Sequence, residues 1–337
     1  MIGDHPSRSS FRIACVLAVL CSAVSVPARA SEAASSSLKP ESLRLGFDRR
    51  IFLGINEADA QAAFKAFVIT SARKRGYDLQ VSSTVYDDAK SMEAAIKAGV
   101  LDLFVVESWT YLGMNISAEG TPHFTSVQED GQGKAEILLV RSNSLIHSIP
   151  DLRGMRLVEY AAANALLGRH WLETVLLEQK LGNCENFFGT IESVTRPSAA
   201  VLPVFFGKKD ACVVDRASFD ILKEMNPQLG RELCILAASE PLIHAVTCLK
   251  NSGWSSPRFK QDLIEAVLEL RADAAGQQIL LVFKTPRIVA FREEHLQSLR
   301  ELFSRHQRLR ADPPGGAETP GHNRMESQPL RDSIERP

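Results

Sequence analysis

Cysteine is scarce in this chain, and its placement argues against a metal site. Two of the six cysteines lie within the first 30 residues. The other four are Cys184, Cys212, Cys234 and Cys248. None of them belongs to a C-x-x-C pair and no histidine cluster accompanies them, so we expect no bound metal. Two alternatives remain open, a structural disulfide in an oxidising compartment or buried free thiols. Cys212 lies in the apolar run 211–214, which favours burial.

The motifs of several large functional classes are also missing. The sequence contains no G-x-S-x-G, H-E-x-x-H or P-loop pattern, and His123, His147, His170 and His244 are scattered. We therefore expect neither an enzyme nor a cofactor. The formal net charge is −1 and no basic run stands out, which argues against nucleic acid as a partner. Beyond the N-terminus, no apolar run approaches the length of a membrane span.

The first 30 residues have the pattern of an export signal. Arg8 and Arg12 precede the apolar stretch 13–26, and the A-x-A sequence at 28–30 places a cleavage point before Ser31. The apolar stretch is shorter than the roughly 20 residues of an ordinary membrane span, although a retained N-terminal anchor is the alternative. We expect the mature protein to work in the periplasm.

The remaining chain alternates between strand-like and helix-like segments. Its first part predicts a βαβαβ unit with a parallel sheet, since an uninterrupted apolar strand is typical of burial on both faces. The expected strands are 43–47, 79–85 and 101–106, and the expected helices are 58–75 and 89–98.

A similar alternation continues to residue 306. The expected strands there are 137–140, 156–158, 211–214, 233–237 and 245–249, and the helices are 165–181, 199–206, 219–225, 257–271 and 293–306. Proline, glycine and polar residues dominate afterwards, which predicts a disordered tail over 308–337.

Three stretches together resemble the phosphonate-type periplasmic substrate-binding proteins, the solute receptors of ABC importers. Residues 98–111 (AGVLDLFVVESWTY) are similar to that family's G-x-x-D, hydrophobic run and Ser/Thr-Tyr turn. Residues 149–157 (IPDLRGMRL) are similar to its D-L-[KR]-G entry into the second lobe. Residues 200–215 (AVLPVFFGKKDACVVD) match its A-V, G-x-x-D-A and hydrophobic-D pattern.

The resemblance implies an α/β, type 2 periplasmic-binding-protein fold with two lobes, a hinge and an interlobe cleft. Lobe 1 would combine 42–131 with 244–306, and lobe 2 would span 133–239. The chain would cross at 131–133 and near 239–241, where glycines and a proline stand. The implied function is capture of a small polar organic ligand, as a monomer, for the membrane permease of an ABC importer. The alternative is a ligand-sensing subunit that signals to a membrane receptor kinase or cyclase.

Candidate ligand contacts follow from the rule that ligands bind beyond the carboxyl ends of strands in an open parallel sheet. The candidates are Phe47, Tyr86, Glu107, Ser108, Trp109, Tyr111, Asn164, Arg196, Asp215 and Arg216. The resemblance implies ligand-facing positions for Tyr111 and Asp215. Simpler roles stay open. The aromatic residues could serve packing alone, Glu107 and Asp215 could serve solely as helix caps, and the arginines could be solvated surface residues.

One departure from the family pattern concerns the ligand. Phosphonate binders typically place a Ser/Thr-Ser-Gly turn at the start of the first long helix of the second lobe, where hydroxyls and helix-end amides hold the anion. Here the equivalent stretch, 159–164, reads EYAAAN and lacks the hydroxyls. Acidic Glu107 and Asp215 with Trp109 and Tyr111 suit a zwitterionic or cationic molecule about as well as a phosphonate. The expected ligand is a small polar organic molecule, phosphonate-like or zwitterionic.

Overall fold

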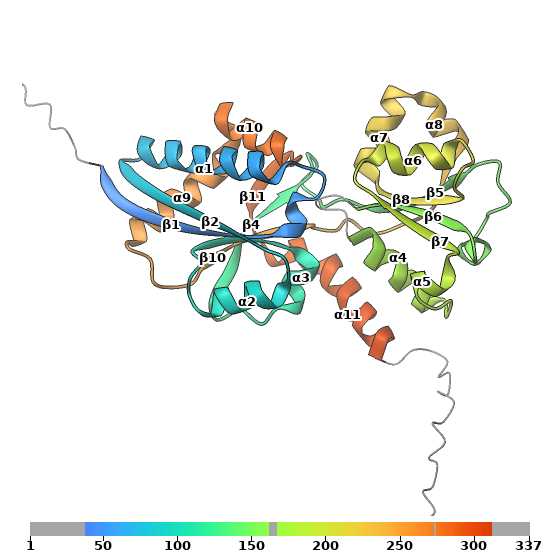
Figure 1. The fold of residues 1–337 in the computed structure, drawn as a ribbon, viewed down its shortest axis with the longest axis horizontal. Coiled ribbons are helices and arrows are strands. Elements are labelled where there is room, and N and C mark those ends of the chain that lie inside the picture. The colour runs from blue at the N-terminus through green and yellow to red at the C-terminus, as the bar shows by residue number, and fades with distance from the viewer. Residues whose placement is uncertain (1–37, 162–166, 273, 312–337) are drawn as a thin grey trace, which may run out of the picture. The chain divides into compact units, whose positions relative to one another are not determined.

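The computed structural model describes residues 38–161, 167–272 and 274–311. Within these ranges the strands form two sheets, each with helices on both faces (Figure 1). We call the sheet that contains the first strand, together with its helices, the first lobe, and the other sheet with its helices the second lobe. None of the described helices is both long and apolar enough to span a bilayer.

The first sheet has the strand order β11, β4, β10, β3, β1, β2. β1 pairs in parallel with β2 and with β3, which confirms the predicted βαβαβ unit. β10 is antiparallel to β3, β4 is antiparallel to β10, and β11 is antiparallel to β4. The sheet is therefore mixed, and the expected parallel arrangement holds for only part of it. The physical reason is that β10 enters from the second lobe, without the crossover that a parallel pair requires.

The bounds of the first lobe's elements are as follows. The strands are β1 (Lys39–Asp48), β2 (Tyr77–Tyr86), β3 (Leu103–Glu107), β4 (Gly120–Val127), β10 (Ala245–Lys250) and β11 (Arg287–Ala290). The helices are η1 (Arg49–Phe52), α1 (Glu57–Lys74), α2 (Ala89–Lys97), α3 (Ser108–Gly113), α9 (Pro257–Leu268), η3 (Leu270–Ala272), α10 (Ala274–Val282), η4 (Glu293–Leu296) and α11 (Gln297–Ala311). Figure 1 shows α1 and α10 on one face of the sheet and α2 on the other.

The second sheet has the order β7, β6, β8, β5, β9, with β6 parallel to β7 and β8, and β5 antiparallel to β8 and β9. Its strands are β5 (Glu136–Arg141), β6 (Arg156–Tyr160), β7 (Thr190–Val194), β8 (Ala211–Asp215) and β9 (Leu233–Ala238). The helices are η2 (Ile149–Leu152), α4 (Leu167–Glu178), α5 (Cys184–Phe187), α6 (Pro197–Phe205), α7 (Arg216–Met225) and α8 (Pro227–Glu232).

Two chain segments connect the sheets, one between β4 and β5 and the other between β9 and β10. Lys134 and Leu242 form an isolated antiparallel bridge between these segments, with N–H···O distances of 2.9 and 2.8 Å. A Cβ atom at Gly133 would lie 2.2 Å from the Leu242 carbonyl oxygen, so only glycine allows this approach. The predicted crossings at 131–133 and 239–241 lie in these segments.

The last helix differs from its prediction at both ends. The predicted helix 293–306 begins as the 3₁₀ turn η4, and α11 then continues to Ala311. Residues 308–311 are therefore helical, so the predicted disordered tail starts too early; the rest of it lies outside the described residues, as does the predicted export signal. α11 packs against α4, where Thr174 Oγ1 and His306 Nδ1 are 2.9 Å apart.

The four described cysteines are free thiols, which decides between the two alternatives left by the sequence. Cys184, Cys212 and Cys248 are buried and Cys234 is exposed. Burial raises the pKa of Cys184 to about 12 and that of Cys212 further still, so these buried thiols stay protonated and unreactive.

Both lobes contain the same local unit around their central buried strand. In the first lobe, Gly99 ends α2 at a φ of 66°, Asp102 precedes β3 and Glu107 ends it. In the second lobe, Gly207 (φ 69°) follows α6, Asp210 precedes β8 and Asp215 ends it, with the same spacing.

In each unit the aspartate holds an arginine of the neighbouring strand. Asp102 accepts hydrogen bonds from the backbone N, Nε and Nη2 of Arg44 and an ion pair from Lys250 Nζ at 2.8 Å. Asp210 accepts the equivalent three bonds from Arg156. The side chain of Asp102 is 5% exposed, whereas that of Asp210 is 26% exposed, so the first pair is better shielded from solvent.

Asp102 and Asp210 occupy equivalent positions in the two lobes and differ in exposure, so substituting each in turn compares a buried ion pair with an exposed one. We expect Asp102→Asn to lower the free energy of unfolding by about 2–4 kcal/mol, because it leaves Lys250 and Arg44 without a buried counter-charge. Asp210→Asn should cost about 0.5–1 kcal/mol, as is typical of exposed pairs. Urea denaturation of both variants measures the difference.

The cost of Asp102→Asn also depends on pH in a defined direction. Burial alone would raise the pKa of Asp102, but the hydrogen bonds from Arg44 and Lys250 outweigh it and lower that pKa. The stabilisation is therefore complete above the ordinary carboxyl pKa and is lost as the pH falls through the lower pKa of the folded state. Equal costs for the two variants at neutral pH would contradict this account.

Candidate functional site

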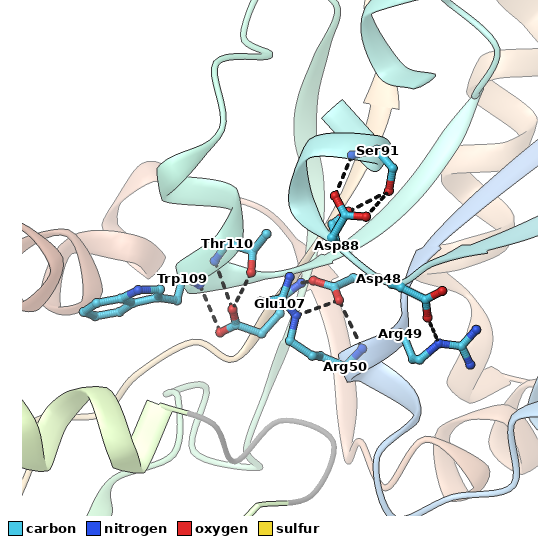
Figure 2. A network of polar contacts seen from close by, with 9 residues as sticks. Asp48, Arg49, Arg50, Asp88, Ser91, Glu107, Trp109 and Thr110 are labelled. Carbon is cyan, nitrogen blue, oxygen red and sulfur yellow. Dashed lines mark hydrogen bonds and ion pairs between the residues drawn. The ribbon is translucent and has the colours of Figure 1, made fainter. Parts of the chain in front are cut away.

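The carboxyl ends of β1, β2 and β3 meet at one edge of the first sheet, and an acidic side chain follows each of them (Figure 2). Glu107 caps α3: Oε1 accepts from Trp109 N at 3.0 Å, and Oε2 accepts from Thr110 N at 2.9 Å and from its hydroxyl at 3.0 Å. Glu107 is 4% exposed, and burial raises its pKa against the opposing effect of these bonds. The simpler role that the sequence left open for Glu107, that of a helix cap, is therefore observed.

Arg50 supplies a cation at this edge. Asp48 Oδ1 accepts from its backbone N at 3.1 Å and from Nε at 2.9 Å, and Asp48 itself is 2% exposed. These bonds hold the guanidinium but leave both Nη groups without a partner among the described residues, and the side chain is 34% exposed. Arg49 differs, since it pairs with Asp87 and Glu57.

The two aromatic candidates of α3 have different surroundings. The Trp109 ring is stacked on His170 of α4, with centroids 4.1 Å apart and an interplanar angle of 1°, and Phe303 of α11 meets its edge. Burial, followed by nearby positive charges that include Arg50, lowers the pKa of His170 to about 4, so the stacked ring is neutral at pH 7. Trp109 therefore packs where α3, α4 and α11 meet. Tyr111 is half-buried, and burial raises its pKa to about 12.

The second lobe presents a corresponding edge at the carboxyl ends of β6, β7 and β8. Asp215 is 1% exposed and caps α7, accepting from Ser218 N at 2.9 Å and from its hydroxyl at 2.7 Å. Arg216 follows it in the first turn of α7, and Arg196 stands at the N-cap of α6. Both arginines are exposed and neither makes an ion pair within the described ranges. Asn164 lies outside the described residues.

Three further sequence-predicted residues lie in less accessible places. Phe47 is 1% exposed and its ring packs edge-on against Phe52 and Phe64, so it belongs to the core. Ser108 is fully buried; its hydroxyl donates to the Ile243 carbonyl at 2.5 Å and its N–H donates to the His244 carbonyl. Tyr86 ends β2 and is half-buried. Phe47 and Ser108 therefore support the edge from inside.

A buried polar pair lies where the two connecting segments meet the sheets. His244 Nε2 and Glu136 Oε1 are 3.3 Å apart, their side chains are 3% and 1% exposed, and neither atom has a hydrogen-bond partner among the described residues. Asp215 lies directly opposite Glu136 in the β5–β8 register. Burial, then the Asp215 charge, raises the pKa of Glu136, while burial lowers the pKa of His244. Both groups are therefore held neutral.

The match to a family model identifies the chain. Residues 54–296 match the model described as ABC transporter, phosphonate, periplasmic substrate-binding protein. The chain belongs to this family. Its members are non-enzymatic, periplasmic components of importers that take up small molecules, which favours the importer receptor over the sensor alternative. No curated protein matches the chain.

Solved structures agree with the type 2 periplasmic-binding-protein fold. A Xanthomonas citri protein bound to ATP is 18% identical, with a TM-score of 0.57 over 80% of this chain and 98% of that one. The binding component of a Pseudomonas aeruginosa ABC phosphonate transporter is 15% identical (TM-score 0.56; 83% and 91% covered). PhnD1 of Prochlorococcus marinus, solved with methylphosphonate, is 14% identical (TM-score 0.54; 79% and 98% covered). At these identities the likeness concerns the fold.

The buried pair generates a prediction for stability. The folded state keeps a proton on Glu136 that the unfolded chain releases above its ordinary carboxyl pKa, so this group makes stability fall as the pH rises through that range toward the raised folded-state pKa. Glu136→Gln removes the penalty. We expect it to raise the free energy of unfolding at pH 7, by about 1.4 kcal/mol for each pKa unit by which folding shifts the carboxyl within that range, and by much less at pH 4.

Thermal and urea denaturation at both pH values test this expectation. Glu224→Gln is the matched control, because Glu224 is exposed on α7 and makes no ion pair within the described residues. An E136Q variant that is destabilised equally at pH 7 and pH 4 would contradict the assignment of a neutral, unsatisfied carboxyl.

Proposed function

We propose that this protein captures a small organic anion, phosphonate-like or zwitterionic, between its two lobes and delivers it to the permease of an ABC importer. The anionic group is the part of the ligand that the site chemistry favours. One observation carries this proposal: at the carboxyl edges of the two sheets Glu107 and Asp215 are engaged by the helices that they cap, whereas Arg50, Arg196 and Arg216 retain N–H donors without a partner in the described chain.

The charges at the two edges support an anion over a purely cationic ligand. Glu107 and Asp215 each accept hydrogen bonds from the helix that they cap, so less of their charge is available to a ligand ammonium. Arg50 keeps both Nη groups, and Arg196 and Arg216 are exposed without an ion pair in the described chain. A guanidinium fork is well suited to two oxygens of a phosphonate, sulfonate or carboxylate.

The second lobe adds backbone donors to these side chains. α6 and α7 begin directly after β7 and β8, so their N-terminal amides lie at the same edge as Arg196 and Arg216. Helix N-termini favour anions because of their free N–H groups and the helix dipole. The ATP and methylphosphonate in the two related structures also carry phosphorus-bound anionic oxygens, which is consistent with this ligand class.

Tyr111 and Tyr86 are the aromatic residues that we assign to the organic part of the ligand. Both are half-buried at the carboxyl edge of the first sheet, whereas one face of Trp109 is already covered by His170. A ligand that touches Tyr111 on one lobe and Arg196 or Arg216 on the other favours the closed arrangement, because only closure lets both lobes contact it.

Ligand-dependent stabilisation tests the proposed function. A saturating ligand at about 100 times its dissociation constant adds about 2.7 kcal/mol to stability. We therefore expect methylphosphonate, 2-aminoethylphosphonate, an alkanesulfonate or glycine betaine to raise the melting temperature by about 5 °C or more, as measured by scanning fluorimetry. Choline, a cation without an anionic group, should have no effect.

Arginine variants locate the site. Arg50→Gln and Arg216→Gln should each weaken binding of the effective anion by about tenfold or more in calorimetry, since a hydrogen bond to a charged group contributes about 1.5–3 kcal/mol. Arg231→Gln, on exposed α8, is the control and should leave the affinity unchanged. A folded protein stabilised by choline but by none of the anions would overturn the proposal.

Export and oligomeric state are parts of the same proposal. We propose that the segment before Ser31 is removed during export to the periplasm and that the mature protein is a monomer. Expression of the full chain in a Gram-negative host should yield periplasmic protein whose N-terminal residue, read by Edman degradation, is Ser31. A membrane-bound product that retains the first 30 residues would contradict this prediction and favour the anchor.

A further inference from the structure

The first lobe encloses an apolar cavity that the family function does not use. A space of about 110 Å³ lies between the first sheet and helices α1, α9 and α10, all of which are labelled in Figure 1. Its lining is dominated by aromatic and aliphatic side chains, among them Phe64, Phe259, Leu103, Ile279 and Phe283. Such a lining offers water few polar partners. One water-sized group needs about 10–15 Å³, so the space has room for roughly seven to eleven such groups.

At one end of the cavity the polar groups already satisfy one another. The Tyr77 hydroxyl donates to Asp262 Oδ2 at 2.6 Å, and Arg258 pairs with the same carboxylate at 2.8 Å. Arg75 pairs with Glu269. This end offers no free donor, and the Asp262 carboxylate would repel a second anion.

The other end opens toward polar groups that lack partners. Ser126 and Thr285 line both the apolar cavity and a small polar pocket of about 10 Å³, so the two spaces adjoin at these two residues. Lys134 and His244 line the small pocket. The half-buried Lys134 ammonium makes no ion pair within the described residues, and neither ring nitrogen of the 3% exposed His244 has a hydrogen-bond partner there.

The geometry points to a second ligand site, for an amphipathic carboxylate such as a medium-chain fatty acid. The alkyl chain fills the space beneath α1, α9 and α10, and the carboxylate accepts hydrogen bonds from Lys134 and His244. An apolar chain is the occupant because the lining offers water almost no polar partner. A single anionic head group is required because the polar pocket holds about one small group and its only charged side chains are Lys134 and Lys284.

Calorimetry with sodium decanoate tests this site. The full chain is first refolded from guanidinium chloride to release any bound lipid. We expect one decanoate to bind per chain and to raise the melting temperature, whereas decanol, which lacks the charge, and butyrate, which lacks the chain, should bind at least tenfold more weakly.

Two variants address the two halves of the site separately. Lys134→Met should weaken decanoate at least tenfold, with Lys208→Met, an exposed lysine on the second lobe, as the control. Ala266→Leu fills the cavity from α9 and should abolish binding, with Ala62→Leu on the exposed side of α1 as the control. Ala72→Val, a smaller addition from α1, serves if the leucine variant does not fold.

The outcomes separate this inference from the proposed function. Arg50→Gln should leave decanoate binding unchanged, and Ala266→Leu should leave binding of the interlobe anion unchanged. A folded protein that binds no decanoate would overturn the inference, as would equal affinity for decanol or binding that neither Lys134→Met nor the cavity-filling variant weakens. None of these results would affect the importer function.

Discussion

The backbone polar groups at the ends of a strand that is buried on both faces need hydrogen-bond partners, and in both lobes side chains at the ends of the central strand hold the neighbouring elements. β3 and β8 meet this requirement in the same way. Asp102 and Asp210 precede them and hold an arginine of the neighbouring strand, while Glu107 and Asp215 end them and cap the next helix. The four carboxylates thereby fix where strand becomes helix, and so where the carboxyl edge of each sheet lies.

The same requirement determines which charges remain for a ligand. Because the acidic side chains at the edges are engaged by their own helices, the positive groups are the ones with free donors. Arg50 shows how finely this depends on local structure: Asp48 orients its guanidinium, whereas its neighbour Arg49 is neutralised by Asp87 and Glu57. In this loop Arg50 therefore keeps donors that Arg49 does not, and the anion preference that we propose rests on the helix caps as much as on the arginines.

Much of the fold could be predicted from the sequence, because the central strands are continuous apolar runs and the helices carry clear end signals such as Gly99 and Pro257. The segments that were missed are those with weak patterns. β7 and β11 are short edge strands with exposed or half-buried positions, and β4 contains proline and histidine. Such strands are defined by their partners rather than by their own residues. The antiparallel half of the first sheet depends on the return of the chain, which no local pattern encodes.

The site could be predicted only as far as its edges. Strand ends correctly indicated Glu107, Trp109 and Asp215 as edge residues, but whether each caps, packs or stays free depends on contacts with distant segments. Glu136 and His244 are 3.3 Å apart although more than a hundred residues separate them, and neither lies in a recognisable motif.

Their lack of partners fits a hinged receptor. A fully satisfied buried pair at the connecting segments would stabilise one arrangement of the lobes, and a ligand can shift that equilibrium only by its own difference in affinity. Because the pair is neutral and makes no hydrogen bond within the described residues, it favours neither arrangement of the lobes. The ligand's difference in affinity then decides which arrangement is populated.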